Sequence, residues 1–178
     1  AHARLGLAAD RPVVLFVFDA LSVVARKNPL AVVEAYQRAF ADDLGRAQLV
    51  IKASRLELFP DDHRALAAAV AAVGGRLIDH YLTRAELGAL FHAATIYISL
   101  HRSEGFGLTM AEAMACGTAV VATAYSGNLD FMTCDNSALV PWTPASVPPG
   151  AGPYPAGATW AEPDVADAAR LLLSLIHI

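Results

Sequence analysis

Short apolar runs of strand length alternate with helical segments along most of this chain. The runs VVLFVF (13–18), AQLVIKA (47–53) and TIYISL (95–100) are each followed by a stretch with helix signals. Uninterrupted apolar strands that alternate with helices are typical of a parallel sheet covered by helices on both faces. The alternation therefore predicts an α/β fold with a doubly wound parallel sheet of about six strands.

Local signals place the ends of the expected helices. Asn28 and Pro29 predict the cap and the first residue of a helix over 29–40. Thr83 and Glu86 form a T-x-x-E capping box at the start of a helix that ends at Ala93. The other expected elements are helices at 61–73 and 108–115 and strands at 76–79, 119–123 and 137–140.

The composition argues against several classes of protein. The 178 residues are 56% hydrophobic and 17% charged, which suits one domain or slightly more. The net charge of −4 comes from mixed signs without a basic stripe, so we expect no nucleic-acid partner. Cys116 and Cys134 lack metal-ligand spacing, which favours a reduced, cytoplasmic setting without a disulfide or zinc site. No apolar run approaches the roughly 18 residues of a membrane span, so no span is expected.

We expect a single domain over 1–178. The segment 141–160 interrupts the alternation and predicts a Pro/Gly-rich loop, which is either a functional loop or a passive linker. The chain starts without methionine and ends in LLLSLIHI without a turn signal, so we interpret it as a fragment of a longer protein. Residues 174–178 fit either an ordinary buried terminal helix or a non-native tail.

The stretch EGFGLTMAE places Glu104 and Glu112 around a glycine-containing turn at the start of a helix. In parallel α/β sheets such turns lie at the carboxyl ends of the strands, where ligands bind. The glycines let a ligand approach the backbone, and the free N–H groups of the helix favour a phosphate. The carboxylates would then accept hydrogen bonds from hydroxyls on either side of a diphosphate, which predicts a nucleotide sugar. Alternatively, Glu104 is an ordinary loop residue and Glu112 a solvated helix residue.

The same residues resemble a known family. EGFGLTMAE has the E-x7-E arrangement of the retaining glycosyltransferases of family four, which have the GT-B fold. SLHRSEGFGLTMAEAMACGTAVVATAYSGNLDFM is similar to their Rossmann-like, carboxyl-terminal donor-binding domain, and so is RKNPLAVVEAYQRAF. The resemblance covers about 13–173, and it implies a glycosyltransferase whose amino-terminal acceptor domain is missing from this chain.

The resemblance implies roles for both glutamates and the turn between them. Glu104 would be the catalytic residue at the transferred sugar, and Glu112 would bind the ribose hydroxyls. The backbone beside the sugar and the distal phosphate would come from four consecutive residues, Gly105, Phe106, Gly107 and Leu108.

A basic pair against the diphosphate is also implied. Lys27 matches the lysine of that pair, but Phe18 and Asp19 stand where many members have Gly-Arg at the end of the first strand. Either Arg26 substitutes for the arginine or the diphosphate is held differently. On its own, Arg26 also fits a solvated residue at a helix start.

Other positions have two interpretations each. Tyr81 and Leu82 would cover the nucleotide base or simply pack at the edge of the sheet. His101 and Arg102 would shape the pocket or be satisfied loop residues. The second glycine loop of the family is matched by Ser126, Gly127, Asn128 and Asp130, and we favour a structural cap for the last of these.

The implied reaction uses a UDP- or GDP-linked sugar as co-substrate and no cofactor. Lys27, with Arg26 and the helix start after Gly107, would stabilise the leaving diphosphate without a metal, because no DxD-like pair faces this turn. Retention of configuration follows from the resemblance. This fragment would bind the donor with little or no turnover. The alternatives are a nucleotide-sugar epimerase of GT-B architecture and a non-catalytic nucleotide-binding or structural domain.

Overall fold

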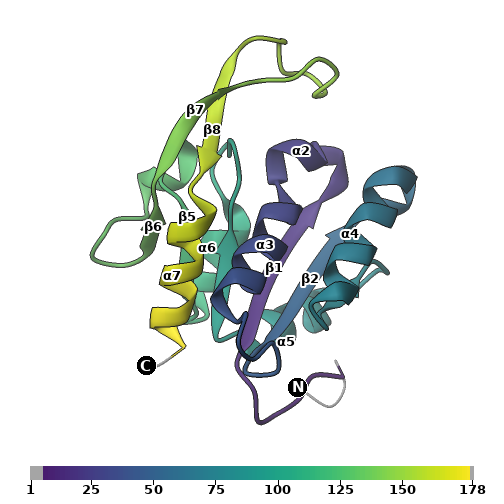
Figure 1. The fold of residues 1–178 in the computed structure, drawn as a ribbon, viewed down its shortest axis with the longest axis vertical. Helices are drawn as coiled ribbons and strands as arrows, with labels where there is room; N and C mark the ends of the chain where they lie inside the picture. The colour runs from purple at the N-terminus through teal and green to yellow at the C-terminus, as the bar shows by residue number, and fades with distance from the viewer. Residues whose placement is uncertain (1–5, 177–178) are drawn as a thin grey trace.

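A six-stranded parallel sheet forms the centre of the protein in the computed structural model, which describes residues 6–176 (Figure 1). Each pair of neighbouring strands is parallel, and the strand order is β3-β2-β1-β4-β5-β6. This order confirms the doubly wound α/β fold, because it consists of two halves that meet between β1 and β4. The strands are β1 (Val13–Asp19), β2 (Gln48–Ser54), β3 (Arg76–Ile78), β4 (Ile96–Ser99), β5 (Ala119–Thr123) and β6 (Ala138–Val140).

Helices cover both faces of the sheet. On one face lie α3 (Pro29–Ala39), α4 (Pro60–Ala72) and α7 (Val165–Leu175), and on the other lie α5 (Arg84–Ala93) and α6 (Leu108–Ala115) (Figure 1). Burial on both faces explains why the strands are apolar without interruption, since the side chains of 13–18 in β1 are all buried. Short helical segments connect these elements, namely η1 (Ala20–Ser22), α2 (Val24–Lys27), η2 (Leu56–Leu58) and η3 (Gly127–Asp130).

The predicted caps of α3 and α5 are confirmed in position. Thr83 and Glu86 form the expected reciprocal capping box of α5. Asn28 is the N-cap residue of α3 and Pro29 is its first residue, as expected, but the Asn28 side chain makes no cap hydrogen bond. Asn28 has a left-handed backbone (φ 53°) because it also ends α2, and its Nδ2 donates instead to the carbonyl of Leu100, 3.0 Å away. The residue therefore joins α3 to the end of β4.

The segment 141–160 is not only a loop. Two antiparallel strands, β7 (Trp142–Ser146) and β8 (Thr159–Pro163), make up its ends, and only 147–158 between them is irregular. Pro144 and the many Gly and Pro residues suggested a loop, but a two-stranded hairpin consists of edge strands, where proline is tolerated. The hairpin extends beyond the carboxyl ends of the central strands, and its tip bends over α2 (Figure 1).

The hairpin has a small core of its own. Val147, Ala151 and Trp160 are buried there, and Val23 from the connection before α2 packs against them. The tip is thus attached to the segment that follows β1.

The carboxyl-terminal residues are helical up to Leu175, as expected of an ordinary terminal helix. Of the segment 174–178, residues 177–178 lie outside the described residues, and the origin of the segment stays a prediction. None of the helices within residues 6–176 combines the length and the apolar character needed to cross a bilayer.

Candidate functional site

A hollow lies at the carboxyl end of β1, beside the point where the two halves of the sheet meet. Ligands of doubly wound folds bind at this topological switch point. The lining residues come from the end of β1, from α2, from the end of β2 and from the turn before α6. They are Val17, Phe18, Asp19, Ser22, Arg26, Lys27, Ser54, Glu104, Phe106, Gly107, Leu108 and Thr109.

Two cations meet one carboxylate in this hollow. Lys27 forms an ion pair with Glu104 through Nζ and Oε2, and the Nη1 of Arg26 lies 3.5 Å from Oε1 of the same carboxylate. The side chains of Arg26, Lys27 and Glu104 are 9%, 12% and 11% exposed, so all three charges are largely removed from water. Arg26 also donates to the carbonyl of Ser103 at 2.6 Å. Arg26 is therefore not a solvated residue at a helix start.

Burial and charge act in opposite directions on the pKa values of this cluster. For the Glu104 carboxyl, burial is the largest single influence and raises the pKa, but Lys27 and Arg26 together outweigh it and the net pKa is lowered. For the Lys27 ammonium, burial is the largest influence and lowers the pKa, while Glu104 partly restores it. Glu104 is consequently ionised near neutral pH and holds the two cations in place.

The turn that carries Glu104 is fixed by the segment after β5. The Oγ of Ser126 accepts from the Glu104 N–H at 2.7 Å and donates to the Glu104 carbonyl at 2.9 Å. The Gly127 N–H donates to the same carbonyl at 3.0 Å. A Cβ on Gly127 would lie 1.9 Å from the Gly105 carbonyl oxygen, so only glycine allows this approach. Gly107 has a positive φ of 94° and begins α6.

A buried histidine, His101, contacts the segment after β5 that fixes the turn. His101 is fully buried, its Nδ1 lies 3.1 Å from the Ser99 Oγ, and its Nε2 faces the Tyr125 carbonyl and the Asn128 Oδ1 at 3.1 and 3.2 Å. Burial lowers the pKa of His101, although these acceptors and Glu104 act against it. Neutral His101 with a proton on Nε2 satisfies this network, so the residue is a buried structural histidine directly behind the hollow.

The structure thus brings most of the predicted site residues together. The ring of Phe106 packs at a tilt of 41° against that of Phe131, with centroids 5.0 Å apart. Leu108, in the lining, and Gly105, beside it, are exposed. Glu112 is exposed on α6, one turn beyond Thr109, and is not among the lining residues.

Tyr81 and Leu82 do not line this hollow. Tyr81 is 84% exposed and borders a neighbouring hollow at the ends of β2 and β3, together with Lys52 and Asp79. Leu82 packs against the hydrophobic core. Leu82 thus packs against the core and Tyr81 borders the neighbouring hollow, and a role of either residue at the nucleotide base stays a prediction.

Sequence reasoning missed an ion pair at the rim. Asp19 occupies the strand end where a Gly-Arg was expected, and its carboxylate pairs with Arg55, the residue directly after β2. Because the carboxyl ends of parallel strands meet at one edge, the positions of Asp19 and Arg55 after two neighbouring strands were a usable signal. An arginine therefore stands beside Asp19, but it follows β2 and lines the neighbouring hollow.

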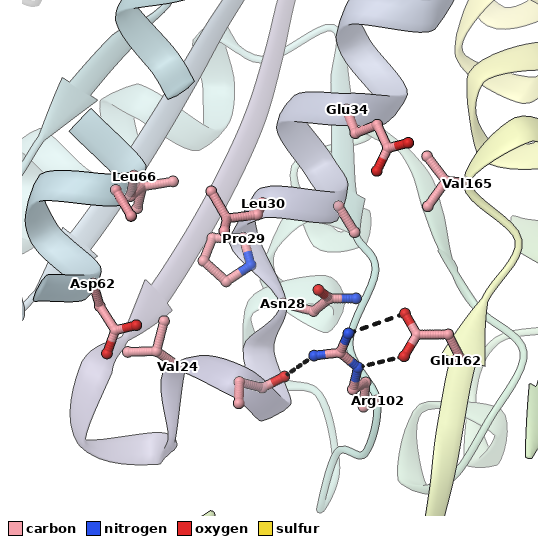
Figure 2. A pocket seen from close by; sticks show the side chains of 13 residues that line it. Val24, Asn28, Pro29, Leu30, Glu34, Asp62, Leu66, Arg102, Glu162 and Val165 are labelled. Carbon is pink, nitrogen blue, oxygen red and sulfur yellow. Dashed lines mark hydrogen bonds and ion pairs between the residues drawn. The ribbon is translucent and has the colours of Figure 1, made fainter. Parts of the chain in front are cut away.

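A third hollow lies on the opposite side of α2, against α3 and α4 (Figure 2). Apolar side chains such as Leu30 and Leu66 line it, and the ion pair of Arg102 with Glu162 closes one side. Its other carboxylates, on Glu34 and Asp62, are exposed, so we assign this hollow no binding role. Across residues 6–176 there is no grouping of three His, Cys, Asp or Glu side chains that suits a metal ion.

Comparison with known sequences gives relatives for most of this chain. The family described as "Glycosyl transferases group 1" matches residues 2–141. A D-inositol 3-phosphate glycosyltransferase 1 of Catenulispora acidiphila is 35% identical over 133 residues, which is 71% of this chain and 31% of the relative. A D-inositol 3-phosphate glycosyltransferase of Acidothermus cellulolyticus is 33% identical over 137 residues, 71% of this chain and 29% of the relative. The chain thus spans less than a third of these relatives.

Solved structures agree on the fold. A glycosyltransferase of Rickettsia africae superposes with a TM-score of 0.74 at 15% identity, over 99% of this chain and 40% of that one. A UDP-forming trehalose-phosphate synthase of Burkholderia xenovorans gives a TM-score of 0.73 at 14% identity, over 96% and 37%. The family match covers the whole of the hollow, from β1 to α6, and the fold agrees with it. The chain belongs to the glycosyl transferases group 1 family.

Proposed function

We propose that this domain binds the nucleotide-sugar donor of a glycosyl transfer reaction in the hollow between α2 and α6. The observation that carries the proposal is the buried cluster of Arg26, Lys27 and Glu104 at the switch point of the sheet. Two cations in a largely dry site are suited to a diphosphate, and a carboxylate between them and a glycine turn is suited to sugar hydroxyls. The family supports the same assignment.

The chemistry of the transfer follows from these charges. When the bond between the anomeric carbon and the diphosphate oxygen breaks, the electron pair stays on the diphosphate. Lys27 and Arg26, with the N–H groups at the start of α6, would stabilise that negative charge without a metal. Glu104 would lie at the transferred sugar and Glu112 at the ribose. We further propose that the configuration is retained, as the resemblance to family four implies.

Glu104 is unsuited to act as a glycosidase-type nucleophile. Such chemistry uses two carboxylates that flank one bond, about 5 to 10 Å apart. Glu112 is exposed one turn beyond the hollow, and Glu104 is already engaged by two cations. Donor binding would instead exchange part of the Lys27–Glu104 ion pair for contacts of Lys27 with phosphate and of Glu104 with hydroxyls.

The acceptor would be bound by another part of a longer protein. This chain spans 29–31% of the relatives it matches, so we propose that the domain alone binds the donor but turns over little of it. Three of the solved structures with this fold are described as UDP-forming, which makes UDP-sugars the first donors to test.

Calorimetric titration of the domain with UDP-, GDP- and ADP-sugars and their bare nucleotides, with and without EDTA, tests the proposal. We expect one base class to bind in an EDTA-insensitive manner, and Lys27→Ala and Glu112→Ala to weaken the binding. Arg170→Ala and Glu34→Ala are matched controls, because each removes one half of an exposed ion pair elsewhere. A folded protein that binds none of these ligands would favour a non-catalytic domain, and interconversion of the free nucleotide sugar would favour an epimerase.

A further inference from the structure

We propose that Arg102 is a positioning residue that clamps residues 23–28, here called the α2 turn, to the β7–β8 hairpin, and so holds Arg26 and Lys27 against Glu104. The inference rests on the proposed function, since it concerns the same cluster. It adds a part of the molecule that no motif marks, namely the hairpin.

The side chain of Arg102 joins the hairpin to the α2 turn directly. Its Nε and Nη2 donate to the two carboxylate oxygens of Glu162 in β8, at 2.7 and 3.0 Å. Its Nη1 donates to the carbonyl of Ala25, at 2.7 Å. Figure 2 shows the guanidinium between Glu162 and the turn, with all three hydrogen bonds. All three guanidinium nitrogens thus donate a hydrogen bond. Ala25 directly precedes Arg26, the first cation of the cluster.

The backbone of Arg102 repeats the same connection. The Arg102 N–H donates to the carbonyl of Arg26 at 2.8 Å, and the Ala161 N–H from β8 donates to the carbonyl of Arg102 at 2.9 Å. The guanidinium also lies 5.4 Å from the centre of the Trp160 ring, within cation–π range. Residue 102 therefore bonds the hairpin on one side and the α2 turn on the other, two positions before Glu104.

The α2 turn needs such support because its own conformation is unfavourable. Val23 is β-branched and has a positive φ of 66°, and Asn28 at the other end has a φ of 53°. Positive φ is a genuine outlier for a β-branched residue, and such strain persists only where the surroundings enforce it. Between these two residues, α2 is only four residues long, too short to be stable by itself.

The tip of the hairpin provides a second contact on the same turn. Gly152 approaches Val23 so closely that a Cβ at residue 152 would lie 2.6 Å from the Val23 Cγ2. The hairpin thus meets the turn at its strained start, through Gly152, and in its middle, through Arg102. This pair of contacts is what the clamp consists of.

The pKa of the Glu104 carboxyl, followed by ¹³C NMR in the absence of nucleotide, tests the clamp. In Arg102→Gln the α2 turn loses its hold, the cations leave the carboxylate, and the pKa of Glu104 rises towards its ordinary value. Arg170→Gln is the matched control, because it removes a surface arginine paired with Asp167 on α7. A folded Arg102→Gln protein with the wild-type pKa at Glu104 would overturn the proposal.

Arg102→Lys separates geometry from charge. Lysine keeps the positive charge but lacks the planar fork that reaches Glu162 and Ala25 together. We expect the same rise in the pKa of Glu104 as in Arg102→Gln. Wild-type behaviour of Arg102→Lys would mean that charge alone acts, and the clamp would be wrong.

A pair of glycine variants keeps the test valid if the Arg102 variants fail to fold. Gly152→Ala and Gly157→Ala place alanine at positive φ values of 60° and 82°, but only residue 152 contacts the turn, and no atom lies within 4 Å of a Cβ at residue 157. Gly152→Ala should therefore raise the pKa of Glu104 and Gly157→Ala should not. Equal effects of the two would contradict the clamp.

Nucleotide titration then separates the clamp from the proposed function. If the donor site is where we propose, Arg102→Gln weakens binding of the nucleoside diphosphate about tenfold, since contacts to two charged groups are loosened. Binding of the nucleoside without phosphates should not change. If the wild-type protein binds no nucleotide, the proposed function fails, while the pKa of Glu104 still decides whether the clamp exists. Equal weakening of nucleoside and diphosphate would indicate general damage and count against the clamp.

Discussion

The two walls of the candidate site are held by different means. The carboxylate wall, around Glu104, is fixed at its own backbone: the Ser126 hydroxyl bonds the N–H and the carbonyl of Glu104, and the Gly127 N–H bonds the same carbonyl. The cation wall, the α2 turn, is held by the guanidinium and the backbone N–H of Arg102 and by the packing of the hairpin core against Val23. The carboxylate wall contains glycine at a position where no side chain would fit, and the cation wall contains a valine in a strained backbone conformation.

This difference indicates which wall can move. A turn that is bonded to a neighbouring loop at a point where only glycine fits has little freedom, whereas a strained turn that depends on contacts with a hairpin can shift when those contacts change. We expect the carboxylate wall to be rigid and the cation wall to adjust when a diphosphate replaces Glu104 as the partner of Lys27.

Removing the charge that joins the walls should have the largest effect. Glu104→Gln leaves Arg26 and Lys27 buried without a counter-charge, and breaking such a pair costs about 3 kcal/mol of unfolding free energy at pH 7. The folded pKa of Glu104 is lowered, so its contribution is present above the unfolded pKa and is lost as pH falls through the folded one. Urea unfolding at pH 7 and at pH 3 should show a large gap between variant and wild type that closes in acid. A gap independent of pH would contradict the ion-pair interpretation.

A change confined to the carboxylate wall should come next. Gly127→Ala places a Cβ 1.9 Å from the Gly105 carbonyl, and the backbone must move because no flexible side chain can give way. We expect a loss of about 2 kcal/mol in stability, typical of overpacking, together with loss of nucleotide binding. Gly88→Ala in α5, where no atom lies within 4 Å of a Cβ, should instead stabilise by about 0.5 to 1 kcal/mol. Thermal unfolding of both variants checks the contrast, and a neutral Gly127→Ala would mean that this wall is not rigid.

The fold and one half of the site were predictable from local sequence. Apolar runs predicted the buried strands, the T-x-x-E pattern predicted the start of α5, and the glycine turn indicated Glu104 as a site residue. These signals could be recognised because each involves only a few neighbouring residues. Lys27 and Arg26 came from resemblance, and the structure brings them to the carboxylate.

The other half depends on contacts between distant residues. Arg102 and Glu162 are 60 positions apart, and Val23 meets Gly152 only because the hairpin bends over α2. Neither the hydrophobic periodicity nor the spacing of motifs in the sequence indicates such long-range pairs. We therefore expected 141–160 to be a loop, and the sequence suggested no partner for Arg102. The partner of the Asn28 side chain was hidden for a similar reason: the sequence pattern predicted the cap position correctly, while a tertiary contact with Leu100 directs the side chain.

The pH dependence of the buried histidine offers a milder test of the carboxylate wall. Burial lowers the pKa of His101, so its contribution to stability is present above the unfolded pKa of about 6.5 and is lost as pH falls below that value. The loss is at most about 1.4 kcal/mol per pH unit. His101→Gln should flatten the stability profile between about pH 7 and pH 5. Denaturant unfolding at several pH values checks this, with His63→Gln as the surface control. A profile that His101→Gln leaves unchanged would place the proton uptake elsewhere.

The variant with the smallest expected effect, Ser126→Ala, separates the contribution of hydrogen bonds to the carboxylate wall from that of its close backbone packing. Ser126→Ala removes the hydroxyl that bonds both the N–H and the carbonyl of Glu104, yet it keeps the backbone contact of Gly127. Loss of these bonds should cost about 1 kcal/mol, and Ser174→Ala on α7, whose hydroxyl is exposed, should cost less. Because Gly127 still excludes movement, the pKa of Glu104 should stay close to that of the wild type. A rise as large as that expected from Arg102→Gln would mean that the carboxylate wall adjusts as readily as the cation wall, and the distinction between them would fail.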